Sequence, residues 1–102
     1  MLTGQHLLLL DEPFGALDAL TRATSQGWLQ SLLAQQPRTV LLVTHDVEEA
    51  IFLSDRILVL TDRPGTIQSV ETIGAPRPRP RSFLTSSEFT AMRARLLQQL
   101  GL

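Results

Sequence analysis

Two short runs of apolar residues, neither of which alternates with polar residues, mark the first half of the chain. The run at residues 6–10 ends at Asp11, and the run at residues 39–44 is rich in branched side chains. Continuous apolar strands are typical of parallel sheets, in which helices cover both faces. Between the two runs, leucines recur at helical spacing after Asp18, a residue type that caps helices. The order strand, helix, strand therefore predicts a parallel pair of strands.

The second half of the chain predicts a short helix, a hairpin and a final helix. Asp46 and Glu49 have the spacing of a capping box at the start of the short helix. Residues 56–61 and 67–72 have the composition of strands, and the Pro-Gly pair between them favours a turn, so we expect an antiparallel hairpin. Thr85 begins a second capping-box pattern and predicts the start of the final helix.

Each of the two longer helices is expected to bury one apolar face. The face expected for the first helix consists of Leu20, Trp28, Leu29, Leu32 and Leu33. The face expected for the final helix consists of Phe89, Met92, Leu96, Leu97 and Leu100. Before that helix, alternating prolines and arginines over residues 76–81 exclude a helix interior or a central strand, and they predict an extended, solvated linker.

Composition narrows the possible chemistry. The 102 residues are 43% hydrophobic and 19% charged, which fits one small folded domain or a piece of a larger one. All basic residues are arginine, so a phosphate-binding loop of the G-x-x-x-x-G-K-[ST] type is excluded from these residues. The absence of cysteine excludes a disulfide framework, a thiolate zinc site and a cysteine nucleophile. A chain without cysteine also suits a reducing compartment, so we expect a cytosolic protein. No apolar run approaches the roughly 20 residues that a membrane span needs.

The charge is divided unevenly along the chain. Residues 1–75 hold nine acidic residues and four arginines, whereas residues 76–102 hold five arginines and one glutamate. A basic tail can attract nucleic acid, but this one has neither lysine clusters nor interleaved aromatic residues. The pattern therefore favours a solvated helix face and a linker over a nucleic-acid partner.

An acidic pair stands where the first strand ends. Asp11 and Glu12 follow the apolar run directly, and the carboxyl ends of strands are where open α/β sheets bind ligands. Consecutive strand residues point to opposite sides, so the two carboxylates are expected to divide the work, one serving a metal ion and the other orienting or deprotonating water. The alternative is that the pair simply marks a strand leaving the core for a turn.

His45 follows the second strand and lies at the same edge of the predicted sheet as Asp11, if the two strands are parallel neighbours. A histidine in that place can donate a hydrogen bond to a phosphate oxygen and to the attacking water. The alternative is a solvated turn residue.

Taken together, these segments resemble the ATPases of ATP-binding-cassette (ABC) transporters. Residues 7–18 resemble their Walker B motif and D-loop, and residues 43–46 resemble their H-loop. Residues 48–60 are similar to the helix and strand that follow the H-loop. The sequences of residues 14–22 and 61–66 are similar to those of the ABC importer branch that transports nitrate, sulfonate or taurine.

The resemblance implies a role for each candidate residue. Asp11 would hold Mg²⁺ through water, Glu12 would be the general base, His45 would contact the γ-phosphate of ATP, and Asp18 would couple two ATPase subunits in a dimer. The implied partners are a transmembrane permease, a second ATPase subunit and, indirectly, a solute-binding protein outside the cell. The implied location is the cytoplasmic face of the inner or plasma membrane.

The family's fold also implies parts that these residues lack. Its phosphate loop, glutamine loop and signature motif belong upstream of Asp11, so we expect a C-terminal portion of a P-loop NTPase fold: a partial ATPase core over residues 1–75, a linker over 76–84 and a helix over 85–102. Because the phosphate-loop strand belongs at the centre of the family's sheet, we expect exposed apolar surface. MgATP binding by this portion alone would be weak or absent.

Two alternatives to an ATPase portion remain open. The first is a non-catalytic interaction or regulatory module that reuses the fold. The second is a proline-arginine ligand for an aromatic-lined groove, which rests on residues 76–80 alone.

Overall fold

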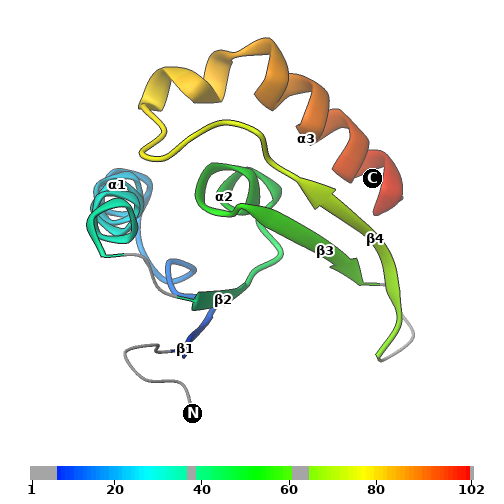
Figure 1. The fold of residues 1–102 in the computed structure, drawn as a ribbon, viewed down its shortest axis with the longest axis horizontal. Helices are drawn as coiled ribbons and strands as arrows, with labels where there is room; N and C mark the ends of the chain where they lie inside the picture. The colour runs from blue at the N-terminus through cyan, green and yellow to red at the C-terminus, as the bar shows by residue number, and fades with distance from the viewer. Residues whose placement is uncertain (1–6, 37–38, 61–64, 102) are drawn as a thin grey trace.

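The computed structural model describes residues 7–36, 39–60 and 65–101, without the side chains of residues 7 and 8. Figure 1 shows the arrangement of its helices and strands. In chain order they are β1 (Leu7–Asp11), α1 (Ala19–Gln35), β2 (Thr39–Val43), α2 (Val47–Leu53), β3 (Arg56–Leu60), β4 (Ile67–Thr72), the 3-10 helix η1 (Arg81–Thr85) and α3 (Ser87–Gln99). No helix in these ranges has the length and apolarity to cross a lipid bilayer.

The strands form two separate pairs, and both pairings predicted from the sequence are confirmed. β1 and β2 are parallel, with Leu7 opposite Thr39 and Asp11 opposite Val43. β3 and β4 are antiparallel, with an irregularity next to Leu60. Within the described part of the chain, β2 and β3 do not pair with each other, so each has an edge without a strand partner.

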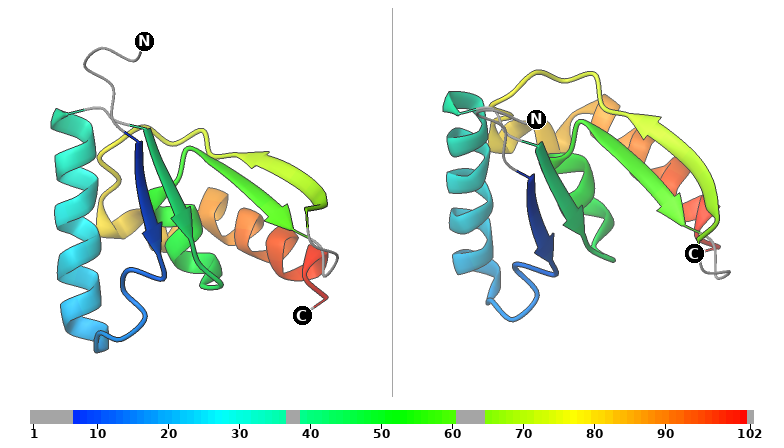
Figure 2. Two further views of the ribbon diagram at one scale, coloured as in Figure 1. Left: turned by 90° about the horizontal axis from the view of Figure 1, so that it is seen from below. Right: turned by 60° about the horizontal axis from the view of Figure 1, so that its bottom comes forward.

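Helices α1 and α2 lie on the same side of the β1–β2 pair (Figures 1 and 2). Alternate residues of these strands, such as Leu10 and Leu42, pack against the core, whereas Leu9, Leu41 and Val43 are exposed. Both strands were expected to be covered on both faces. Among the described residues, one face stays open, because no described helix lies on that side. The expected exposure of apolar surface is therefore confirmed.

The core lies among α1, α2, β3, the segment after β4 and α3. Its most deeply buried residues are Ile51 and Phe52 of α2. The rings of Phe83 and Phe89 meet edge to face with centroids 5.6 Å apart, an arrangement that favours aromatic pairs. The buried apolar residues are Phe14, Leu29, Ile51, Phe52, Leu53, Val59, Ile73, Phe83, Phe89, Met92 and Leu96.

The expected apolar face of α1 is wrong in part. Leu20 and Trp28 are 79% and 66% exposed, whereas Gln26 and Gln30 are buried beside Leu29. The reason is a polar contact that the apolar spacing does not reveal. The side-chain amide of Gln30 donates to the carbonyl of Arg79 at 3.2 Å and accepts from its N–H at 2.9 Å. This two-point contact turns the glutamine face of α1 inward.

Residues 76–80 form neither helix nor strand, and the three prolines are exposed as expected for a solvated linker, but Arg77 is half-buried and Arg79 is buried. The guanidinium of Arg79 is buried and donates to the carbonyls of Ala75 and Phe52, at 3.0 to 3.1 Å. Arg77 donates to the carbonyl of Leu53 and pairs with Asp55 at 3.0 Å. Since the last carbonyls of a helix lack partners within it, the two arginines cap the end of α2.

Helix α3 begins one position later than predicted. Ser86 is the cap, because its hydroxyl oxygen accepts the N–H of Phe89 at 3.1 Å. Thr85 instead ends η1, where its hydroxyl donates to the carbonyl of Ser82. The predicted face is confirmed at Phe89, Met92 and Leu96, which are buried, but Leu100 is 44% exposed.

Candidate functional site

The parallel pairing of β1 and β2 brings the two predicted clusters to one edge of the sheet. Asp11 is the last residue of β1, opposite Val43. The backbone N–H of Glu12 donates to the carbonyl of Val43 at 2.8 Å and extends the ladder by one residue. Glu12 then takes a positive φ of 49°, which turns the chain sharply out of the strand. The sequence therefore delivers Glu12 to the start of the segment that follows β2.

Glu12 and His45, which are 33 positions apart, bind each other directly. The backbone N–H of His45 donates to Glu12 Oε1 at 3.1 Å, and the ring Nδ1 lies 2.6 Å from the same oxygen. An ionised carboxylate only accepts hydrogen bonds, so Nδ1 carries the proton in this contact. Nε2 can then donate to a further oxygen only when the ring holds a second proton. The imidazole itself is 91% exposed and therefore open to a ligand.

The second oxygen of Glu12 lies beside a glycine. A Cβ added at Gly15 would stand 3.8 Å from Glu12 Oε2. That distance is ordinary van der Waals contact, so an alanine would fit at this position. The geometry leaves Oε1 held by His45 and Oε2 free to accept a proton from water.

Asp11 is exposed, and its carboxylate has no hydrogen bond or ion pair to another described residue. A free carboxylate beside open space suits Mg²⁺, which binds through one or two carboxylates and fills its other positions with water and phosphate oxygens. In the described ranges, no cluster of three or more histidine, cysteine, aspartate or glutamate side chains is arranged to hold a metal ion. Asp11 fits as one ligand of an ion held mainly by other groups.

Asp18 lies at the other end of the loop and caps α1. Its carboxylate accepts the N–H of Thr21 at 2.8 Å and the hydroxyl of Thr21 at 3.1 Å. The hydrogen bonds from Thr21, the backbone one first, lower the pKa of Asp18 below its ordinary value. The predicted cap is confirmed. The predicted role of Asp18 in a dimer stays a prediction.

The sequence reasoning passed over Arg22, which lies one turn into α1. Its guanidinium donates to the carbonyls of Phe14 and Leu17 at 3.2 and 3.0 Å, and it lies 4.0 Å from the carboxylate of Asp46. The sequence carries no signal for this role, because the hydrogen-bond acceptors of Arg22 are backbone carbonyls.

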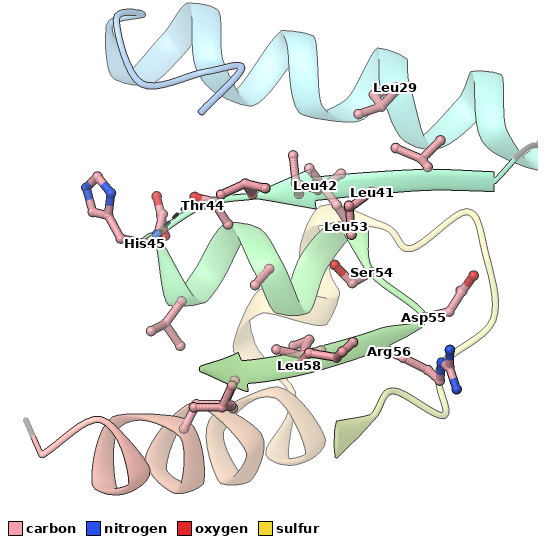
Figure 3. A pocket seen from close by; sticks show the side chains of 18 of the residues that line it. Leu29, Leu41, Leu42, Thr44, His45, Leu53, Ser54, Asp55, Arg56 and Leu58 are labelled. Atoms are coloured by element: carbon pink, nitrogen blue, oxygen red, sulfur yellow. Dashed lines mark hydrogen bonds between the residues drawn. The ribbon is translucent and has the colours of Figure 1, made fainter. Parts of the chain in front are cut away.

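A groove separates the two strand pairs. It has a volume of about 1230 Å³ and is lined by residues of β2, α2 and β3, with Leu29 and Leu33 of α1 and Leu96 and Leu100 of α3. Figure 3 shows Leu41 and Leu42 on β2 and Leu58 on β3 along the groove, with His45 toward one end. The groove is mainly apolar, and the unpaired edges of β2 and β3 both line it.

The sequence is similar to those of known ATP-binding proteins. The chain is 55% identical over 95 residues to an aliphatic sulfonates import ATP-binding protein of Nocardia farcinica, and 61% identical over 75 residues to one of Rhodococcus jostii. It is also 47% identical over 95 residues to an uncharacterized ABC transporter ATP-binding protein of Methanocaldococcus jannaschii. The chain is a homologue of ABC transporter ATP-binding proteins. The predicted resemblance is thus confirmed.

The alignments cover most of this chain but only part of each relative. The three alignments cover 93%, 74% and 93% of this chain, but 36%, 29% and 34% of the respective relatives. The chain therefore spans about a third of the length of the relatives it matches, and it fits the C-terminal part of an ABC ATP-binding subunit. No protein-family model matches the chain.

Proposed function

We propose that these residues form the water-activating part of an ATP-hydrolysing subunit that powers the import of sulfonate or a similar small anionic solute. The observation that carries the proposal is the direct contact of Glu12 with His45 at the carboxyl edge of a parallel strand pair. Glu12 accepts the proton of the attacking water at Oε2. His45 holds Oε1 and, when doubly protonated, offers Nε2–H to a phosphate oxygen.

The chemistry of the donors supports this division of roles. A general base needs a carboxylate held in place yet open to water, and Glu12 is half-buried with one oxygen bound and one free. When bound, Mg²⁺ would neutralise charge that develops on the transferred phosphoryl group, and Asp11 is the residue that would hold it. The D-loop role of Asp18 in a nucleotide-bound dimer belongs to the same proposal.

The groove supports a P-loop NTPase fold. The unpaired edges of β2 and β3 face a groove lined mainly by apolar side chains, and an unpaired strand edge exposes N–H and C=O groups with which a further strand can pair. In the ABC fold, the strand before the phosphate loop lies at the centre of this sheet. These 102 residues contain no lysine, so the phosphate-binding lysine would come from the part of the ATPase that carries the phosphate loop.

The partners and location follow from the same proposal. The names of the Nocardia and Rhodococcus relatives describe import proteins, which favours a membrane permease and a second ATP-binding subunit as partners of this chain. The complex would lie at the cytoplasmic face of the membrane. The division of the chain into a partial core over residues 1–75, a linker over 76–84 and a helix over 85–102 also stays a proposal. Arg77 and Arg79 bind the linker to the end of α2.

A chimera tests the proposal. The aligned 95-residue segment of the Nocardia farcinica relative is replaced by this chain, and ATP hydrolysis is compared with that of the unmodified relative. The proposal predicts hydrolysis in the chimera. A chimera that folds and binds ATP but does not hydrolyse it would support the non-catalytic alternative instead.

A further inference from the structure

Arg22 joins two segments that are far apart in the sequence. Its Nε donates to the carbonyl of Phe14 at 3.2 Å, and its Nη2 donates to the carbonyl of Leu17 at 3.0 Å. Its third nitrogen, Nη1, faces the carboxylate of Asp46 at 4.0 Å. The side chain therefore connects the loop after β1 with the cap of α2. In Figure 2 this loop and the junction of β2 with α2 lie at the same end of the strands.

The loop supplies the carbonyls in a fixed arrangement. Two successive turns shape it, in which Gly15 donates to the carbonyl of Glu12 and Leu17 donates to that of Phe14. The ring of Phe14 is buried in the core and anchors the middle of the loop. The planar, forked guanidinium can meet acceptors in several directions at once, which a lysine ammonium on a flexible stem does less well.

The partner across the junction is the residue next to His45. Asp46 caps α2, because its Oδ1 accepts the N–H of Glu49 at 3.1 Å, and its other oxygen faces Arg22. Glu12 begins the loop whose carbonyls accept hydrogen bonds from Arg22. His45 directly precedes Asp46, the cap of α2, whose carboxylate faces Arg22. The one side chain thus spans both halves of the Glu12–His45 pair without contacting either of those side chains.

We propose that Arg22 is a positioning residue that holds the general base against His45. This inference rests on the proposed function, since it assigns how the water-activating pair keeps its geometry. Without the fork, the loop retains its Phe14 anchor but loses its connection to α2. The Glu12 carboxylate then samples orientations away from His45, and fewer of them leave Oε2 directed at a reacting water.

Hydrogen exchange on the 102-residue chain tests the structural half of the inference, independently of any catalysis. Arg22→Gln should speed amide exchange in the segments 12–18 and 44–46, measured at Gly15, Leu17 and His45, whose N–H groups donate to Glu12 and Phe14. Arg95→Gln is the matched control, since Arg95 pairs with Glu71 on the far side of the molecule and should leave both segments unchanged. Unchanged exchange in Arg22→Gln would overturn the inference.

Kinetics of the chimera test the catalytic half. A mispositioned group costs up to about 100-fold in rate, so Arg22→Gln should lower kcat by about 10- to 100-fold with little change in KM for ATP. Arg22→Lys keeps the positive charge but not the forked guanidinium, so its kcat should lie between those of the unsubstituted chimera and Arg22→Gln. An unchanged kcat in Arg22→Gln, or full activity in Arg22→Lys, refutes the role of the fork. If the chimera without the Arg22 substitution is inactive, the proposed function is refuted instead. The hydrogen-exchange result then decides whether Arg22 holds the loop against the start of α2.

Discussion

The open groove between β2 and β3 predicts that the isolated chain binds a hydrophobic dye and self-associates. Four apolar residues along it stay near half exposure, namely Leu41, Val43, Leu58 and Leu60. An exposed apolar strip beside two unpaired strand edges is a template for association. The perturbation that tests this reasoning is the double replacement Leu41→Gln with Leu60→Gln.

The magnitude follows from the exposure of these side chains. Complete burial of a leucine contributes about 1.5 to 3 kcal/mol. With Leu41 and Leu60 at 52% and 61% exposed, about half of that contribution is unrealised, or roughly 1 kcal/mol for each residue. Across all four side chains the sum is about 4 kcal/mol, against a net stability of about 5 to 15 kcal/mol for complete domains. Covering the groove is thus a large driving force for association.

The assay combines dye fluorescence with size-exclusion chromatography. The double variant should bind less dye and elute closer to the monomer, because both side chains already contact water and lose little on replacement. Met92→Gln is the matched control, since Met92 is buried in α3 away from the groove. That change should destabilise the chain by about 1 to 3 kcal/mol and increase dye binding.

A monomeric wild-type chain that leaves the dye's fluorescence unchanged would refute this reasoning. Equal dye binding by the wild type and the double variant would refute it as well. The first result would mean that the groove is closed in solution, and it would favour an independent module over a portion of a larger ATPase. The second would mean that the dye binds elsewhere on the chain.

Two further predictions concern the core. Arg79→Met should lower the free energy of unfolding by about 3 kcal/mol, because it leaves buried carbonyls at the end of α2 without a donor. Arg81→Met should cost less than about 1 kcal/mol, because Arg81 is exposed and its guanidinium makes only a cation–π contact with the ring of Phe52. Urea unfolding of both variants in the background of the Leu41→Gln, Leu60→Gln double variant measures the two costs. Burial, reinforced by the charge of Asp46, raises the pKa of Glu49 above its ordinary value, so folding favours the protonated form. Wild-type stability should therefore fall as pH rises through and above the ordinary glutamate range near 4.3, and the advantage of Glu49→Gln should grow over that interval; pH-independence of the difference would contradict the assignment.

The strand pairs and the placement of both candidate clusters at one edge of the sheet could be predicted from the sequence, because both follow from local patterns. The direct contact of Glu12 with His45 was not predicted. Apolar runs set the strands, and the parallel order then places both strand ends at one edge. The inward face of α1 could not be predicted in this way. Gln30 is buried because its amide meets the backbone of Arg79, and a contact across 49 positions leaves no trace in helical spacing.

The same limit explains the packed arginines and the later start of α3. Alternating prolines and arginines correctly excluded regular structure, but whether a guanidinium faces water or a helix end depends on the tertiary fold. Thr85 and Ser86 are both good caps by residue type, and the 3-10 turn that precedes α3 decides between them. Arg22 was missed because its acceptors are backbone carbonyls, which every sequence carries.

The most direct test of the account is the effect of Glu12→Gln on the Nocardia chimera. Glutamine keeps the shape of the side chain and can still accept from His45, but it cannot take up the proton of water. The account predicts a loss of about 10² to 10⁴ in the rate of ATP hydrolysis, with ATP still bound. Hydrolysis at the unmodified rate in Glu12→Gln would contradict the assignment of Glu12 as the general base.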